Sequence, residues 1–153
     1  MPAYTKPLPQ VDDLNRPHWE GAVRGEFLVQ QCSLCKHRWF PPLPNCPACL
    51  ATDYTWSKVS GRGVVHSVIV YHQGWLPGYK EAIPYNVAII ELEEGLRVIN
   101  NIVGVPGEQI PLGAKVRERQ VVAQLGQDLE GLLGGHGALV LLPAARHRPA
   151  RRS

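Results

Sequence analysis

Four cysteines carry the clearest chemical signature in this sequence of 153 residues. They form two Cys-x-x-Cys pairs, Cys32 with Cys35 and Cys46 with Cys49, with ten residues between the pairs. A C-x-x-C turn presents two thiolates from one tight knuckle, and two facing knuckles supply four soft ligands for a tetrahedral ion. The spacing predicts a metal centre that holds zinc, although iron in the same four-sulfur geometry is not excluded. Because no His, Asp or Glu lies at ligand spacing to leave an open position, we expect a structural centre.

Two other uses of paired cysteines compete with metal binding. Disulfides within the C-x-x-C turns would close very small loops and would need an oxidising compartment. A thioredoxin-like redox pair begins a helix after a strand, whereas the segment from Cys32 to Lys36 ends one expected strand and leads into another. The metal interpretation is therefore favoured over both.

His66 and His72 are the candidates for acid–base chemistry. A catalytic histidine needs an acid or a nucleophile within hydrogen-bond reach, and neither forms a recognisable triad with Ser67 or Asp53. We expect core or rim histidines that hydrogen-bond to the backbone. The sequence also shows no nucleophile elbow, phosphate loop or paired carboxylates, so we expect no catalysis by this chain alone.

Composition and charge exclude several classes of protein. Every continuous apolar run is short, whereas a membrane span needs roughly 20 apolar residues. The N-terminus carries prolines and charge where a secretory signal would carry an apolar core, which predicts a cytoplasmic protein. The formal charge is +3, but the last eleven residues contain four arginines and no acid, so the remaining body comes to about −1. The number of charged residues in the body therefore predicts no basic face that would bind phosphates.

The residues that could do chemistry must be positioned by one helix and several short strands. A helix is expected within 12–25, where Asp13 or Asn15 can cap it, Pro17 suits the first turn and Gly25 can end it. One face of this helix would carry Leu14, Trp19, Ala22 and Val23. Turn residues separate the expected strands, which are Phe27–Gln31, Tyr54–Val59, Gly63–His72, Tyr85–Glu91, Leu96–Val103 and Lys115–Arg119.

This pattern predicts a mainly-β chain in four parts. Residues 1–26 are an arm and a helix. Residues 27–53 form a ribbon that is too rich in Pro and Cys to fold around an apolar core without a stabilising cross-link. Residues 54–119 form a small antiparallel barrel of the OB type. Residues 120–153 are an atypical extension, in which the pattern allows a helix over 121–133, and its basic end has the composition of a disordered segment.

Several segments together resemble the DUF35 family, in an order and spacing that make the match specific. The resemblance runs from near Arg16 to near Arg117, about two-thirds of the chain. It implies an N-terminal helix, a rubredoxin-like zinc ribbon held by the four cysteines and a C-terminal OB-fold. The segments are Trp19-Glu20-Gly21, Phe27–Cys35, Phe40-Pro41-Pro42, Cys46-Pro47-x-Cys49, Ser60-Gly61-Arg62-Gly63 and the hairpin Pro84–Arg97 with Asn101 after it.

The chain departs from the family pattern at two places. Leu43 stands where members commonly have a basic residue after the Phe-Pro-Pro step, which puts a phosphate contact there in doubt. Members usually close the barrel with a final strand, whereas this chain continues from Glu118 into a stretch rich in Gly, Leu and Gln.

The resemblance also implies a function in acyl-CoA and lipid metabolism. Family members are accessory subunits that work beside thiolases, thiolase-like aldolases or hydroxymethylglutaryl-CoA synthases. Their OB part, or the groove between ribbon and barrel, receives CoA or acyl-CoA, while the partner supplies the chemistry. The expectation for this chain is a non-catalytic, zinc-containing subunit that binds acyl-CoA and supports a thiolase-fold partner.

Aromatic and arginine side chains are the candidates for contacts with acyl-CoA or with the partner. A CoA adenine or an acyl chain needs flat apolar surface with a few polar groups beside it. The loop that holds Trp75 would expose large rings unless a ligand or a partner covers them, whereas core packing explains Trp39 and Phe40 equally well. The full set is Trp39, Phe40, Trp75, Tyr79 and Tyr85, with Arg62 and Arg97 for a pyrophosphate or for ordinary surface ion pairs.

Two other functions fit the same elements. Ribbons and OB barrels also bind single-stranded nucleic acid through aromatic stacking and a basic groove, which the body charge disfavours. The chain could alternatively be a small enzyme that acts on acyl-CoA by itself through His66 or His72.

Overall fold

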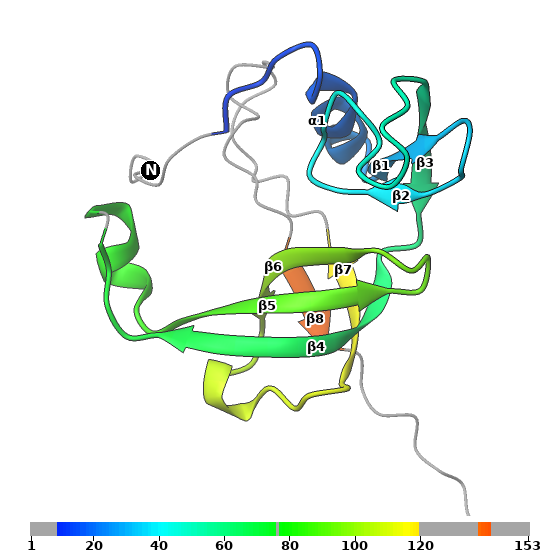
Figure 1. The fold of residues 1–153 in the computed structure, drawn as a ribbon. Helices are drawn as coiled ribbons and strands as arrows, with labels where there is room; N and C mark the ends of the chain where they lie inside the picture. The colour runs from blue at the N-terminus through cyan, green and yellow to red at the C-terminus, as the bar shows by residue number, and fades with distance from the viewer. Residues whose placement is uncertain (1–8, 76, 120–137, 142–153) are drawn as a thin grey trace, which may run out of the picture.

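A computed structural model describes residues 9–75, 77–119 and 138–141. It confirms the expected fold class, since one helix and a small three-stranded sheet lie against a five-stranded barrel (Figure 1). In this described part, no helix is long and apolar enough to cross a membrane.

Helix α1 (Arg16–Val23) is shorter than the segment expected from the sequence. Pro17 occupies its first turn, but the Asn15 side chain caps no helical N–H. Its Oδ1 accepts from the Asp12 N–H, and the Asn15 backbone N–H donates to the Asp12 carboxylate. At the other end Gly25 has a φ of +74°. The N–H groups of Gly25 and Glu26 donate hydrogen bonds to the carbonyl oxygens of Ala22 and Gly21 in the last turn of the helix. The helix therefore stops where the glycine predicts.

The buried face of α1 differs from the expected one. The buried residues are His18, Gly21 and Ala22, whereas Val23 is exposed. A Cβ on Gly21 would lie 2.7 Å from the Leu28 side chain, so glycine at this position lets the helix approach strand β1 (Phe27–Cys32) closely.

The cysteine ribbon forms a sheet in the order β2-β1-β3, where β2 is Arg38–Trp39 and β3 is Tyr54–Val59. We expected β3 to be the first strand of the barrel. Instead, each of its six residues pairs with one on β1, from Phe27 opposite Val59 to Cys32 opposite Tyr54. The structure thus groups Tyr54–Val59 with the ribbon, and the chain enters the barrel after it.

The barrel is closed by five strands in the order β4-β5-β6-β8-β7. Only β6 and β8 run parallel among the described barrel pairs, and this arrangement matches the five-stranded Greek-key barrel of an OB-fold. The elements of this part are β4 (Arg62–Tyr71), η1 (Pro77–Ala82), β5 (Tyr85–Leu92), β6 (Arg97–Val103), η2 (Gly107–Gln109), β7 (Lys115–Arg119) and β8 (Ala138–Leu141).

Strand β8 comes from the segment that the sequence set apart as an extension. It lies between β6 and β7, with Asn101 opposite Ala138 and Val116 opposite Leu141. Four residues within a stretch rich in Gly and Leu carry no alternation that would identify a strand, so only the barrel's register reveals it. The helix allowed over 121–133 and the basic end over 143–153 lie outside the described residues.

One apolar core joins the ribbon to the barrel. Ala88, Ile90 and Leu92 point inward from β5, and the same cluster contains Phe27 from β1 and Val59 from β3. Beyond this core β4 and β5 continue as a long hairpin arm that ends at η1 (Figure 1). A bulge at His66 bends β4, since Val65 pairs with Ile90 while Ser67 pairs with the adjacent Ile89.

Candidate functional site

The four cysteines meet in one cluster at the end of the ribbon. Their Sγ atoms all lie within 4.8 Å of one another. Two pairs join the two knuckles, at 3.6 Å from Cys32 to Cys49 and 3.6 Å from Cys35 to Cys46. All four thiols are free, and the distances between the knuckles also exceed the ~2.05 Å of a disulfide bond. The arrangement does not support a disulfide within either C-x-x-C turn.

The two knuckles have the same local backbone. In the first, the Cys32 N–H donates to His37 O and the Lys36 N–H donates to Cys32 O. In the second, Cys46 and Leu50 make the equivalent bonds, at the same spacing along the chain. Lys36 and Leu50, each directly after the second cysteine of its pair, both have positive φ, of 62° and 63°. This repeated turn aims both pairs of sulfurs at one point.

The electrostatics of the cluster favour a cation at that point. The Cys35 N–H donates to the sulfur of Cys32 and lowers the pKa of this thiol to about 6. At Cys49 the N–H of Ala51 acts in the same direction, but the neighbouring sulfurs and burial outweigh it and raise the pKa to about 12. Four sulfurs this close cannot all be thiolates unless a positive charge offsets their repulsion.

The cluster therefore fits a tetrahedral metal ion. With metal–sulfur bonds of about 2.3 Å, the sulfurs of a zinc site lie about 3.8 Å apart, close to the separations across the knuckles. Cys32, Cys35, Cys46 and Cys49 would supply all four ligands, which leaves no position for a substrate or a water. Such an ion would hold the ribbon together and would not take part in catalysis.

Trp39 and Phe40 lie in packed regions of the ribbon. Trp39 is buried beside Cys32 and Cys46, and its ring meets Tyr54 edge-on at 5.9 Å. Phe40 is half-buried against the main core, and its ring lies 4.7 Å from His18. Both side chains therefore pack as core residues. Core packing is one of the two roles that the sequence allows for them, the other being contact with a ligand or a partner.

The other three predicted aromatic residues meet at one cavity. Trp75, Tyr79 and Tyr85 line a cavity of about 410 Å³ at the arm formed by β4 and β5. The Tyr71 and Tyr85 rings are stacked, with centroids 5.2 Å apart, and Tyr79 leans on Tyr85 at 5.3 Å. Trp75 is 80% exposed at the rim. Sequence reasoning missed Tyr71, Val87 and Asn101, which complete the lining.

The two arginines face carboxylates. Arg62 lies 3.4 Å from Glu93, and Arg97 lies 3.1 Å from Glu91, with both pairs on the surface. Arg62 also lines a second cavity of about 530 Å³, whose charged lining combines Arg62 and Lys115 with Glu91 and Glu93. The structure does not bring either arginine to the aromatic cavity.

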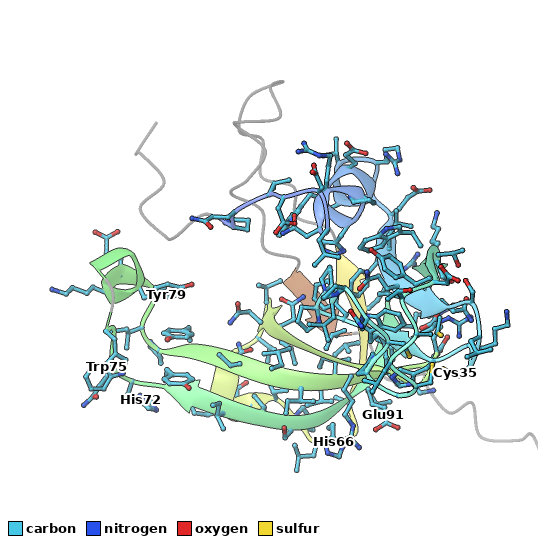
Figure 2. The ribbon with its side chains drawn as sticks, turned by 45° about the horizontal axis from the view of Figure 1, so that its top comes forward. Cys35, His66, His72, Trp75, Tyr79 and Glu91 are labelled. Carbon is cyan, nitrogen blue, oxygen red and sulfur yellow. The ribbon has the colours of Figure 1, made fainter. Side chains whose placement is uncertain are left out.

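Both candidate histidines are exposed, so neither is a core residue. His66 lies in the β4 bulge, and His72 lies 3.9 Å from Glu108. Figure 2 shows His72 with Trp75 and Tyr79 at one end of the molecule and Cys35 at the opposite end. The aromatic cavity and the metal cluster are therefore separate sites.

Comparison with known proteins now assigns the family. Residues 19–55 match the rubredoxin-like zinc ribbon domain of ChsH2, and residues 56–121 match the C-terminal OB-fold domain of ChsH2. The chain belongs to the DUF35 family. This membership assigns the four-cysteine cluster to a zinc ribbon and the five-stranded barrel to an OB-fold.

A solved DUF35 structure described as the Ltp2-ChsH2(DUF35) aldolase is similar in fold and sequence. It has a TM-score of 0.68 and 31% identity, over 87% of this chain and 98% of that one. A probable enoyl-CoA hydratase alpha subunit of Thermomonospora curvata is 35% identical over 75% of this chain. A DUF35 domain-containing scaffold protein of Methanocaldococcus jannaschii is 38% identical over 56% of it. The chain spans 35% and 61% of the lengths of these two curated relatives.

Proposed function

We propose that this DUF35 chain is a non-catalytic accessory subunit that binds an acyl-CoA and supports a thiolase-fold enzyme in acyl-CoA metabolism. The observation that carries the proposal is the aromatic cavity on a scaffold whose relatives include subunits of a CoA hydratase and of an aldolase. The proposal assigns the cavity to the acyl-CoA and leaves the reaction to the partner.

The lining of the cavity suits a flat, largely apolar ligand. The stacked Tyr71 and Tyr85 rings provide a planar wall, and the exposed Trp75 ring stands at the rim. Covering an exposed aromatic ring stabilises a complex by roughly 25 cal/mol for each Å² of apolar surface removed from water. Asn101 adds a polar group to the lining. An adenine ring or an acyl chain has the matching shape and chemistry.

The candidate catalytic groups support an accessory role. Within the described residues, neither His66 nor His72 hydrogen-bonds to a serine, threonine or cysteine, so neither can activate a nucleophile in this arrangement. His72 faces the carboxylate of Glu108 near the surface. This weighs against the stand-alone acyl-CoA enzyme.

The charge pattern weighs against the single-stranded nucleic-acid binder. Such proteins combine stacking rings with a groove of unpaired cations that follows the backbone. Here Arg62 and Arg97 are each offset by a glutamate, and the aromatic cavity has no charged residue in its lining. Within the described residues, the lining of the aromatic cavity therefore provides stacking surface without cations.

Calorimetric titration with acetyl-CoA and benzoyl-CoA tests the ligand part of the proposal. We expect saturable binding by the wild-type chain and at least a tenfold loss of affinity in Trp75→Ala, whose side chain is too exposed to affect folding. Leu112→Ala removes a similarly exposed side chain, at 67%, from a barrel loop outside the cavity, and should bind like wild type. Absence of binding by wild type, or equal affinity in Trp75→Ala, would contradict the assignment.

Gel filtration with purified thiolase-fold enzymes from the same organism tests the partner part. One co-eluting complex with higher activity than the enzyme alone is the expected result. Separate elution, with full activity of the enzyme alone, would remove the accessory role even if the chain binds acyl-CoA.

A further inference from the structure

The outward face of barrel strands β4, β5 and β6 carries several apolar side chains where water would normally select polar ones. The inward positions of β5 are buried, so its outward positions include Val87 and Ile89. On the neighbouring strands the outward residues Ile69 of β4 and Ile99 of β6 are 54% and 70% exposed. An antiparallel strand with one solvated face ordinarily alternates apolar and polar residues.

Strand register makes these four residues one surface. Ile69 lies opposite Val87, and Ile89 lies opposite Ile99. Directly opposed side chains on one face of a sheet are in contact range, and Val87 and Ile89 are successive residues on the outward face of β5. Ile69, Val87, Ile89 and Ile99 therefore form one patch, here called the outer apolar strip, with Ser67 opposite Ile89 as its polar neighbour on β4.

The outer apolar strip leads directly to the aromatic cavity. The next opposed pair along β4 and β5 is Tyr71 with Tyr85, and Val87 itself lines the cavity. At its other end the strip stops at Glu91 and Arg97, which neutralise each other at 3.1 Å. The strip and its border therefore present no net charge, which selects an uncharged apolar surface and disfavours an acidic peptide or a phosphate backbone.

We propose that the outer apolar strip is the surface on which the thiolase-fold partner docks. This inference rests on the proposed function and adds the location of the contact. A partner seated on the strip lies beside the cavity assigned to the acyl-CoA, because both share Val87. The exposed Leu34 and Leu50 stand next to the ligands Cys35 and Cys49 in the chain, and Figure 2 shows Cys35 at the opposite end of the molecule from Trp75 and Tyr79.

Binding of the purified thiolase-fold protein, measured by biolayer interferometry, tests the location. The double variant Ile69→Asp and Ile99→Asp places two charges in the strip, and we expect at least a tenfold weaker Kd than for wild type. Leu34→Asp is the control for a surface charge, since it charges a side chain that is 75% exposed on a knuckle, compared with 54% and 70% for Ile69 and Ile99, and it should stay within twofold of wild type. Ile69→Thr with Ile99→Thr keeps β-branched residues on both strands, and should weaken binding less but measurably.

Each outcome of this experiment supports or overturns the location. Equal affinity in wild type and in both double variants places the contact elsewhere and leaves the accessory function standing. A selective loss in Leu34→Asp moves the contact to the knuckles. If wild type does not bind the thiolase-fold protein, the proposed function fails and the location fails with it. If light scattering shows wild-type dimers that the strip variants dissociate, and the partner still binds the resulting monomers, the strip is a self-association surface instead.

Discussion

His18 is the buried titratable side chain that connects helix α1 to the ribbon. It lies among Trp19, Phe27 and Phe40, with ring centroids 4.7 to 5.7 Å away, and is 7% exposed. Its Nδ1–H donates to the carbonyl oxygen of Leu28, at 2.9 Å. Burial lowers its pKa because a charged imidazole would lose its hydration, and this effect outweighs the hydrogen bond, which acts the other way.

The lowered pKa of His18 predicts acid sensitivity. The unfolded chain binds the proton more tightly, with a histidine pKa near 6.5, so the contribution of neutral His18 is complete above that pH. It is lost as the pH falls from about 6.5 towards the folded-state pKa, by up to about 1.4 kcal/mol for each pH unit. Urea unfolding at pH 7.5, 6.5 and 5.5 should show a falling free energy of unfolding.

His18→Asn is the control for this dependence, because the asparagine amide can donate to Leu28 O but does not titrate in this range. We expect the variant to be less stable than wild type at pH 7.5, since it fills less of the ring's space. The difference should shrink towards pH 5.5. A constant difference would show that the acid sensitivity of wild type comes from elsewhere, including protonation of the cysteine ligands.

At the scale of elements, local patterns predicted the strands and their contents well. The extent of Tyr54–Val59 is confirmed, and the β1 and β7 segments agree to within a residue, because turn residues bound each apolar run. The cysteine cluster could be predicted because its ligand spacing is a property of two short turns. Trp75, Tyr79 and Tyr85 could be grouped because one loop carries the first two and ends where the third begins.

Long-range pairing is what sequence patterns did not reveal. Nothing local distinguishes a strand that pairs with β1 from one that pairs within the barrel, so only the register reveals that β3 pairs with β1. Tyr71 joins the aromatic cavity only through its register with Tyr85. The partners of Arg62 and Arg97 likewise depend on the hairpin that brings Glu93 and Glu91 beside them.

Asn86 is a further residue whose role depends on pairing. The regular β5–β6 ladder ends at Ala88 opposite Asn100, and β6 then pairs with β8. The buried Asn86 side chain spans the gap, since its Nδ2 donates to Ile102 O and its Oδ1 accepts from Ile102 N, both at 2.7 Å. Its own carbonyl accepts from Asn101. The side-chain amide of Asn86 therefore makes the two hydrogen bonds to Ile102 that a backbone pair would make in a continuous ladder.

Removing this amide should destabilise the barrel. Asn86→Ala leaves a buried N–H and a buried C=O of Ile102 without these partners, at a cost of about 3 kcal/mol in total. We expect a lower urea midpoint with little change in the slope of the transition. Asn100→Ala, which loses only a local bond to the next residue on the same strand, should change the midpoint much less.

At the scale of the whole molecule, the ribbon and the barrel are connected by more than the chain. The apolar core of the barrel includes three side chains from the ribbon sheet, those of Phe27, Val29 and Val59. Beside them, Glu94 at the tip of the β5–β6 hairpin accepts a hydrogen bond from Ser60 N, in the link between β3 and β4. An interface with shared apolar side chains couples the stabilities of the two parts.

This coupling predicts the effect of removing the metal. A structural zinc ion contributes on the order of 10 kcal/mol, comparable with the whole stability of a domain, so a chelator should unfold the ribbon. Trp39, buried against Cys32 and Cys46, should then become exposed, with a red shift of its fluorescence. Because β1 and β3 fill part of the barrel core, the thermal midpoint of the barrel's circular dichroism should fall together with the tryptophan signal.

The two signals separate a coupled molecule from two independent parts. If the ribbon and barrel fold as one unit, chelation lowers both midpoints together, and restoring zinc raises both. Trp39→Phe keeps an aromatic ring beside the cysteines but removes its emission, so it separates the part of the fluorescence change that comes from Trp39 from the part that comes from the other three tryptophans. A barrel midpoint that stays unchanged while the Trp39 signal is lost would show that Phe27, Val29 and Val59 are dispensable to the barrel. The zinc ion would then stabilise the ribbon alone, and the barrel would keep its fold in the metal-free chain.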